Sequence, residues 1–427
     1  CFIIETSILP KIPISIVMKN EGSIMAKRKY SIESRVDYSV ILPVFFLLLI
    51  GLVAIYIATS NDSPTAVMKV MTQQVVWILL GCGIAFVVML FSTEFLWKIT
   101  PYLYGLGLVL MVLPLIFYSP ALVESTGAKN WVTIGSVTLF QPSEFMKVSY
   151  ILMLSRYSIW FRQKYKEDSL ANDWKLLGVF ALITLPVMIL LGLQKDLGTA
   201  MVFAAILSGL VLLSGISWWI IAPVLILVVL LIGGFLMIFL LPHGKDLLHS
   251  LGMDTYQINR ISAWLDPFSY ARTIAYQQTQ GMISIGSGGF AGKGFNVIDL
   301  SVPVRESDMI FTVIAEDFGF LGSVAVLGLY LLLIYRMIHV IFESNNRFYT
   351  YIATGFIMMI LFHIFENIGA ALGILPLTGI PLPFISQGGS SLITNLICVG
   401  LILSMSYQNN LHREEEMRKH FRRSDRY

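Results

Sequence analysis

Charged residues are scarce in this chain of 427 residues: Asp, Glu, Lys and Arg make up only 13% of it, whereas 56% is hydrophobic. So few charges cannot form the surface of a water-soluble protein of this length, and lipid must therefore cover much of the chain. Cysteine is scarce too, with three residues and no CxxC or Cys/His spacing. The sequence thus gives no sign of a zinc site or of a disulfide framework.

The first 24 residues have no clear role. The chain begins with Cys1, whereas residues 25–29, Met-Ala-Lys-Arg-Lys, are typical of a natural bacterial start. No long apolar core precedes a small-residue cleavage site, so a signal peptide is not indicated. We expect residues 1–24 to be a translated, non-native upstream leader and residues 25–37 to be a cytoplasmic N-terminus.

Ten stretches of the sequence approach the roughly 20 apolar residues that a bilayer span needs. They are approximately 38–58, 75–91, 99–118, 142–157, 176–193, 197–215, 218–241, 309–337, 349–371 and 388–407. Only residues 194–196 separate the fifth stretch from the sixth, and one unbroken helix would be too long, so we expect two helices with a tight turn. The sequence predicts an all-α, polytopic membrane protein with a transmembrane domain at 38–407.

Lys and Arg residues are concentrated in the loops on one side of these spans and in a basic tail, residues 408–427. Because cytoplasmic loops carry such an excess, both ends of the chain are predicted to lie inside. The tail is typical of contact with anionic membrane lipid, and nucleic-acid binding has little support. The longest loop, 242–308 between the seventh and eighth spans, then lies outside the cell, and its aromatics and glycines indicate an ordered, functional segment.

Ionisable residues inside or beside the spans are candidate functional groups, because placing them in a membrane is costly. Glu144 and Lys147 are three residues apart on one helix face and are expected to pair, either in a functional site or as a structural ion pair. Lys195 and Asp196 lie in the tight turn, where they are either solvated or functional.

Two further pairs of ionisable residues lie within apolar stretches. Glu316 and Asp317 follow the start of the eighth span, which implies a polar cavity or buried partners. His363 and Glu366 form another pair three residues apart, for which we expect an inter-helix hydrogen bond rather than catalysis.

Two segments of the long loop carry candidate chemistry. Residues 285–294 are rich in glycine but fail the Walker pattern. We interpret them as a tightly turning loop, with a phosphate contact through backbone N–H groups as the alternative. Asp308 stands directly before a long apolar helix, where it either caps that helix or acts as a general base next to Arg305.

Together these segments resemble the SEDS family of shape, elongation, division and sporulation proteins, which includes RodA, FtsW and SpoVE. The resemblance covers about residues 34–407, and the short tails favour the RodA branch, as found in low-GC Gram-positive bacteria. Its markers are the motifs TGAKNW (126–131), QPSEFMK (141–147), QKDLGTA (194–200), IGSGG (285–289), GKG (292–294), SDMIF (307–311), AED (315–317) and PLTGIPLPFISQGGSS (376–391).

The resemblance implies a peptidoglycan glycosyltransferase of the bacterial plasma membrane that polymerises lipid II during cell elongation and shape maintenance. It implies that Asp308 is the catalytic base. It also implies a class B penicillin-binding protein, a transpeptidase, as partner, together with other elongation-complex membrane proteins such as MreC and MreD. No organic cofactor is implied, and a divalent cation, Mg²⁺ or Mn²⁺, is an alternative to the protein's own cations.

The substrate-binding candidates that follow from these motifs come from the spans and from the long loop. They are Trp131, Glu144, Lys147, Lys195, Asp196, Gln280, Lys293, Arg305, Ser386 and Gly388. Which of Arg305, Lys147 and Lys195 stabilises the leaving diphosphate stays open at this point.

The chain departs from the family pattern at two positions. Val304 replaces a common Glu, so any second carboxylate would come from elsewhere, with Glu306 and Glu144 as candidates. Gln387 stands where a Tyr is common. Two other functions remain as alternatives: a flippase or transporter that moves lipid II, and a scaffold of the elongation complex that is active only through its partner.

Overall fold

The structure is a computed structural model that describes residues 37–424, apart from 136, 166, 168, 298–299 and 345. The expected leader, residues 1–24, and all but the last residue of the expected cytoplasmic N-terminus, residues 25–37, lie outside the described residues. In the expected tail, residues 408–427, the backbone is described as far as residue 424.

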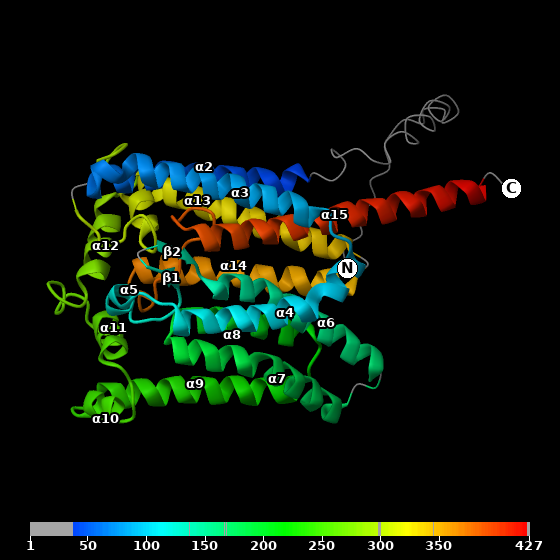
Figure 1. Ribbon diagram of the computed structural model, residues 1–427, viewed down its shortest axis with the longest axis horizontal. Helices are drawn as coiled ribbons and strands as arrows, with labels where there is room; N and C mark the ends of the chain where they lie inside the picture. Colours follow the sequence, from blue (N-terminus) through cyan, green and yellow to red (C-terminus); the bar gives the residue numbers. More distant parts are fainter. Residues whose placement is uncertain are drawn as a thin grey trace, which may run out of the picture.

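Ten long helices in the described part of the chain run side by side as one bundle (Figure 1). They are α2 (Tyr38–Asp62), α3 (Val67–Met89), α4 (Thr93–Ile116), α6 (Pro142–Lys164), α7 (Leu170–Gln194), α8 (Leu197–Leu213), α9 (Trp218–Leu240), α13 (Ile310–Glu343), α14 (Arg347–Ala371) and α15 (Gly389–Ser424). Each coincides with one predicted span, and the polytopic all-α architecture is confirmed.

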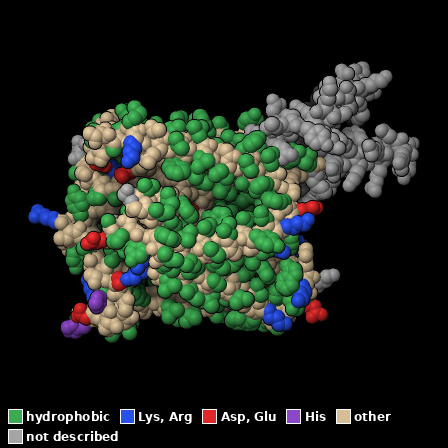
Figure 2. All heavy atoms as spheres, viewed as in Figure 1, with side chains coloured by type: hydrophobic (Ala, Val, Ile, Leu, Met, Phe, Trp, Pro, Cys, Tyr) green, Lys and Arg blue, Asp and Glu red, His purple; other side chains and the backbone are tan. Residues whose placement is uncertain are grey.

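Eight of these helices are long and apolar enough to cross a membrane by length and composition. The other two are α8, which has 17 residues, and α6, whose sequence contains five charged residues. Figure 2 shows a broad band of hydrophobic side chains around the bundle, with charged side chains gathered toward its two ends. This distribution is what a protein with a lipid-covered belt requires.

The predicted long loop is ordered and lies across one end of the bundle (Figure 1). It contains α10 (Gly244–Ser250), α11 (Thr255–Leu265) and α12 (Tyr276–Ser287), and the short helix α5 (Pro120–Thr126) lies at the same end. A small antiparallel hairpin, β1 (Val132–Ile134) and β2 (Val137–Phe140), is the exception to an all-helical description. We call this end the outer end and the opposite one the cytoplasmic end, following the Lys/Arg bias.

The turn between α7 and α8 is as tight as the sequence predicts. Lys195 ends α7 in a left-handed conformation with φ 59°. Asp196 then caps α8, because its side chain accepts a hydrogen bond from the Thr199 N–H at 3.0 Å. Because the turn needs only these two residues, both helices keep their full apolar length.

The helices pack through small residues, as membrane helices do when apolar burial gives no net attraction between them. On α15, Gly400 lies directly against α3, where an added Cβ would stand 2.5 Å from the backbone oxygen of Ala85. On α3, a Cβ added to Gly81 would stand 2.5 Å from a methyl carbon of the Leu396 side chain. In contrast, Gly83 on α3 has open space beside it. The α3–α15 contact therefore depends on the absence of a side chain at Gly400.

The helix α9 differs from the rest because it buries little of its surface. Only Ile220, Ile221 and Phe239 are buried along it, which is the smallest buried share among the eight apolar spanning helices. Phe239 packs with Leu248 and Ile258 of the outer segment in a small separate cluster. The helix α9 is therefore attached at its two ends, through Ile220 and Ile221 to the main core and through Phe239 to the outer segment.

We predict that Gly400→Ala destabilises the protein by about 1–3 kcal/mol, because the new methyl group forces α3 and α15 apart. The matched control is Gly83→Ala, which adds the same methyl group to open space and should be neutral or stabilising by up to about 1 kcal/mol. Thermal unfolding of both variants in detergent measures the difference. Equal melting temperatures for the two variants would contradict this account of the contact.

Candidate active site

Asp308 lies at the outer end, directly before α13, and is held by two other elements. Its side chain is buried, and Gln277 Nε2 on α12 donates to its Oδ1 at 3.5 Å. Asn367 Nδ2 on α14 donates at 2.8 Å to the backbone oxygen of Asp308 and, at the same distance, to that of Ile380. The helix α14 therefore fixes the backbone of Asp308 and of the segment that follows α14.

Arg260 on α11 is the cation whose charge acts most strongly on Asp308. Its guanidinium donates to the backbone oxygen of Leu377 and to the Tyr256 hydroxyl, which hold it in place. Burial raises the pKa of Asp308 to about 6, and the charge of Arg260 is the main opposing influence. Such a carboxylate is mostly ionised at neutral pH and is more basic than an exposed Asp, as a general base should be.

A second carboxylate near Asp308 comes from α14. Glu366 accepts a hydrogen bond from the Thr378 hydroxyl, and its charge interacts with those of Asp308 and Arg260. The sequence suggested Glu306 or Glu144 for this place. The charge of Glu306 does act on Asp308. The structure shows that the charge of Glu366, which the sequence did not suggest for this place, interacts with Asp308 as well.

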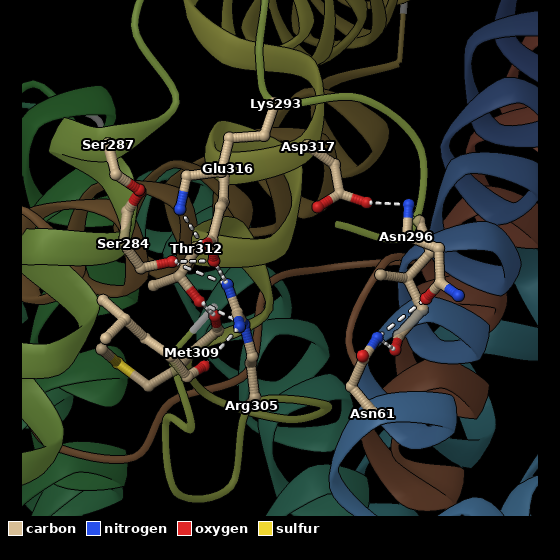
Figure 3. A network of polar contacts seen from close by, with 12 residues as sticks. Asn61, Ser284, Ser287, Lys293, Asn296, Arg305, Met309, Thr312, Glu316 and Asp317 are labelled. Atoms are coloured by element: carbon tan, nitrogen blue, oxygen red, sulfur yellow. Dashed lines mark hydrogen bonds and ion pairs between the residues drawn. The ribbon is translucent and has the colours of Figure 1, made fainter. Parts of the chain in front are cut away.

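Arg305 belongs to the network of polar contacts that Figure 3 shows. Its side chain is 0% exposed and forms an ion pair with Glu316. It also donates to Ser284 Oγ at 2.6 Å and to Thr312 Oγ1 at 3.2 Å. Lys293 Nζ reaches the other oxygen of Glu316 at 2.7 Å. A substrate contact of Arg305 or Lys293 stays a prediction, and for Arg305 it would require the guanidinium to leave these partners.

The glycine-rich run packs into a break in α13. The helix is interrupted at Gly319, whose φ of 63° and ψ of −156° are not helical. The backbone N–H groups of Lys293 and Gly294 donate to carbonyl oxygens just before the break, at 2.9 and 3.1 Å. An added Cβ at Gly292 would stand 2.1 Å from an α13 backbone oxygen, so only glycine fits there. These two amides already have acceptors, which favours the turn interpretation over a phosphate contact.

Glu144 and Lys147 lie inside the bundle on α6 and pair as expected, with Lys147 Nζ 2.9 Å from Glu144 Oε2. Both side chains are buried. The expected inter-helix contact of His363 is present as well, because its Nε2 on α14 lies 3.3 Å from Lys147 Nζ. These three groups link α6 to α14, and a role in substrate binding stays a prediction.

Asp196 and Lys195 lie at the outer end, where two motifs far apart in sequence meet. Asn130 Nδ2 donates to Asp196 Oδ2 at 2.8 Å. Lys195, whose side chain is 52% exposed, forms a 2.8 Å ion pair with Asp254, the residue before α11. Trp131 is half-buried next to Asn130. This group therefore joins the α7–α8 turn to the outer segment that carries Arg260.

The segment between α14 and α15, residues 372–388, contacts the chain just before Asp308. Ser386 Oγ donates to the backbone oxygen of Ser307 at 2.6 Å. The Gly388 N–H lies 3.4 Å from Gln74 Oε1 on α3. Gln280 is half-buried on α12, one turn after the Gln277 that reaches Asp308. Among the sequence-predicted residues, Ser386 is thus bonded to the chain next to Asp308, whereas Glu144 and Lys147 lie on another helix within the bundle.

A bundle of ten long helices, most of them apolar, and a buried carboxylate near a cation at one end define a polytopic membrane protein with a candidate acid–base site. The chain belongs to the FtsW/RodA/SpoVE family of cell cycle proteins, which matches residues 38–411. The family expected from the sequence motifs is therefore confirmed.

Relatives and solved structures agree with this assignment. The chain is 31% identical over 385 residues to the peptidoglycan glycosyltransferase MrdB of Escherichia coli, covering 89% of this chain and 95% of MrdB. It is 34% identical over 324 residues to the probable peptidoglycan glycosyltransferase FtsW of Thiomicrospira cyclica, covering 73% and 76%.

Two solved structures share the fold at 27% identity. A chain of a peptidoglycan synthase complex that coordinates polymerization and crosslinking superposes with a TM-score of 0.70, over 87% of this chain and 98% of that chain. The crystal structure of the rod shape determining protein RodA of Thermus thermophilus gives a TM-score of 0.59, over 87% and 96%.

We predict that Glu316→Gln destabilises the protein by about 3–5 kcal/mol, because it leaves Arg305 buried without its counter-charge. Replacing both partners by Leu should restore much of this loss, since no buried charge then remains at the pair. The control is Lys195→Gln, which breaks an exposed ion pair and should cost less than about 1 kcal/mol. Thermal unfolding distinguishes these cases, and a double variant less stable than Glu316→Gln would contradict the prediction.

Proposed function

We propose that this chain is a peptidoglycan glycosyltransferase that polymerises lipid II at the outer face of the bacterial plasma membrane, with Asp308 as general base. The observation that carries the proposal is the buried Asp308 carboxylate at the outer end, beside Arg260 and with a raised pKa. The names of the relatives support the class of reaction, because MrdB and FtsW are both called peptidoglycan glycosyltransferases.

The reaction joins two sugars and releases a lipid diphosphate. The 4-hydroxyl oxygen of the acceptor GlcNAc bonds to C1 of the donor MurNAc, and the bond from C1 to the diphosphate oxygen breaks with inversion. The carboxylate of Asp308 takes the hydroxyl proton as the oxygen attacks. Undecaprenyl diphosphate leaves with the electron pair of the broken bond.

The leaving diphosphate needs positive charge rather than a general acid. Arg260 is the cation that acts most on Asp308, and Lys195 is half-exposed at the same end. Lys147 and Arg305 are already paired with buried carboxylates. This arrangement favours Arg260 for charge stabilisation over the three cations that the sequence suggested.

A divalent cation would supply further positive charge to the diphosphate. In the described part of the chain, no three His, Cys, Asp or Glu side chains come together as metal ligands. Mg²⁺ and Mn²⁺ accept one or two carboxylates together with phosphate oxygens and water. Asp308 and Glu366 are the carboxylates that such an ion would use here.

A crosslinking partner fits this activity. One solved neighbour belongs to a complex that coordinates polymerization and crosslinking. A class B penicillin-binding protein would supply transpeptidation to this chain, and MreC and MreD would belong to the same elongation complex. The buried set of Glu144, Lys147 and His363 is the observation that favours the flippase alternative, since ionisable groups within a bundle mark transport pathways.

We predict that the chain, purified with its penicillin-binding partner, polymerises labelled lipid II and that Asp308→Asn lowers the rate about 10²–10⁴-fold, the usual contribution of a general base. Moenomycin suppresses contaminating glycosyltransferases of another type. The control is Asp246→Asn, which removes an exposed carboxylate of α10 at the same end. Polymer from Asp308→Asn at the wild-type rate would remove Asp308 from the centre of the reaction. A folded, partnered wild type that makes no polymer would instead favour the flippase or scaffold alternatives.

We predict that activity falls about tenfold per pH unit below pH 6, because protonated Asp308 cannot accept the proton and its pKa is about 6. In Arg260→Gln the charge that opposes the effect of burial is gone, so the pKa of Asp308 rises. The acid limb of the pH–activity profile, where activity falls with falling pH, then moves to higher pH. Arg272→Gln, an exposed arginine of the same outer segment, is the control and should leave the limb in place. If the acid side of the pH–activity profile of Arg260→Gln stays where it is in the wild type, Arg260 does not influence the pKa of Asp308.

A further inference from the structure

A polar cavity of about 410 Å³ opens at the cytoplasmic end, away from Asp308. It lies between the C-terminal ends of α6 and α8 and the N-terminal end of α14. Its lining includes Arg162, Tyr165, Ser214, Arg347, Thr350 and Tyr351. Two guanidinium groups and four hydroxyl groups around a small cavity suit an anion with several acceptor oxygens.

Arg162 is fixed in the wall of this cavity. Its Nε donates to the backbone oxygen of Ser214 at 3.1 Å, and its Nη2 forms a 2.9 Å ion pair with Asp173. Asp173 in turn accepts a hydrogen bond from the Ser217 N–H at 2.9 Å. Because the framework already orders the guanidinium, a ligand that contacts it pays little additional side-chain entropy.

Arg347 supplies charge from the other side. It is exposed at the first position of α14, and the N-terminus of that helix adds partial positive charge. Arg162, Arg347 and Tyr351 line the same cavity, and the charges of both arginines act on the Tyr351 hydroxyl. Arg347 also lines a larger neighbouring cavity of about 1420 Å³, so the site is open to one side.

Further cations surround Tyr165 at the same end. The ammonium groups of Lys164 and Lys175 lie 5.5 and 5.4 Å from the centre of its ring. Among the described residues of the stretch 162–175, the carboxylates are Asp173, which is paired with Arg162, and Glu167, which is exposed. The surroundings are therefore positively charged overall.

Aromatic residues beside the cavity indicate its position along the membrane normal. A hollow of about 470 Å³ adjoins it along the chain, because Leu212 and Gly215 line the hollow while Ser214 lines the cavity. Trp218 and Trp219, which are 66% and 84% exposed, lie at this hollow. Exposed Trp is typical of the membrane–water interface, so the cavity stands at the level of lipid headgroups.

We propose that this cavity binds the phosphate group of an anionic phospholipid of the cytoplasmic leaflet. Basic pockets between helices on this side of a membrane take lipid headgroups. The arginines would bind the phosphate oxygens, and the acyl chains would lie on the exposed apolar surface near Trp218 and Trp219. Such a lipid would be bound independently of the lipid-linked sugar substrate, which is used at the opposite end.

The test uses the full chain in phosphatidylcholine nanodiscs that contain increasing fractions of phosphatidylglycerol. We expect phosphatidylglycerol to raise the melting temperature of the wild type. In Arg347→Gln the apparent affinity should fall about fivefold, the effect of losing about 1 kcal/mol per basic residue at an anionic surface. Lys98→Gln, which removes an exposed cation of the same end outside this cavity, should keep the wild-type affinity.

Two further arms make the source of the phosphate clear. Arg162→Lys keeps the charge but loses the planar fork, and it should also weaken the response to phosphatidylglycerol. Glycerol 3-phosphate or inorganic phosphate, added to pure phosphatidylcholine nanodiscs, should give no comparable shift. An equal shift with these soluble anions would overturn the lipid assignment. A response to phosphatidylglycerol that survives in both Arg347→Gln and Arg162→Lys would overturn the site.

Discussion

The buried ion pair between Arg305 and Glu316 is the constraint on which the outer end depends. Neither side chain is exposed, and a charge so far from water persists only where partners satisfy it. Ser284 from α12 and Lys293 from the glycine-rich run bring those partners from two separate parts of the loop. A single carboxylate on α13 thereby holds the long outer segment against the bundle, and Asp308 lies between the two members of the pair in the chain.

The break in α13 serves the same arrangement. A continuous helix would satisfy its own carbonyl oxygens, and the glycine-rich run would have nothing to bond to. With the break at Gly319, the run donates to α13, and Phe320 donates back to Gly289 at 2.9 Å. Asn296, itself at φ 61°, donates its N–H to Asp317 at 2.6 Å, and Asn61 of α2 bonds to the Asn296 side chain at 2.8 Å (Figure 3). Hydrogen bonds thus connect α2, the loop and α13 directly.

The sequence predicts the features that local chemistry decides. Apolar length locates the ten helices, and the excessive length of one unbroken helix predicts the turn between α7 and α8. Spacing within one helix predicts the pairing of Glu144 with Lys147. What it misses comes from contacts between distant segments: Arg260 and Glu366 reach Asp308 only because α11, α14 and the segment around Leu377 fold together. For Arg305, nearness to Asp308 in sequence suggested a shared surface, but spacing does not tell which way a side chain points outside regular structure.

The position of Asp308 at the very start of a membrane helix reconciles two requirements of a reaction between lipid-linked sugars. The polyprenyl chains belong in the bilayer, whereas the sugars belong in water, so the reacting bond must lie where the two meet. At that boundary a fully exposed Asp would be a weak base, and a deeply buried one would stay protonated. Burial raises the pKa of Asp308 and the charge of Arg260 opposes this rise, so the pKa is about 6, between those limits. In the reaction that we propose, the same cation would also stabilise the leaving diphosphate, so that one residue would serve both the base and the leaving group.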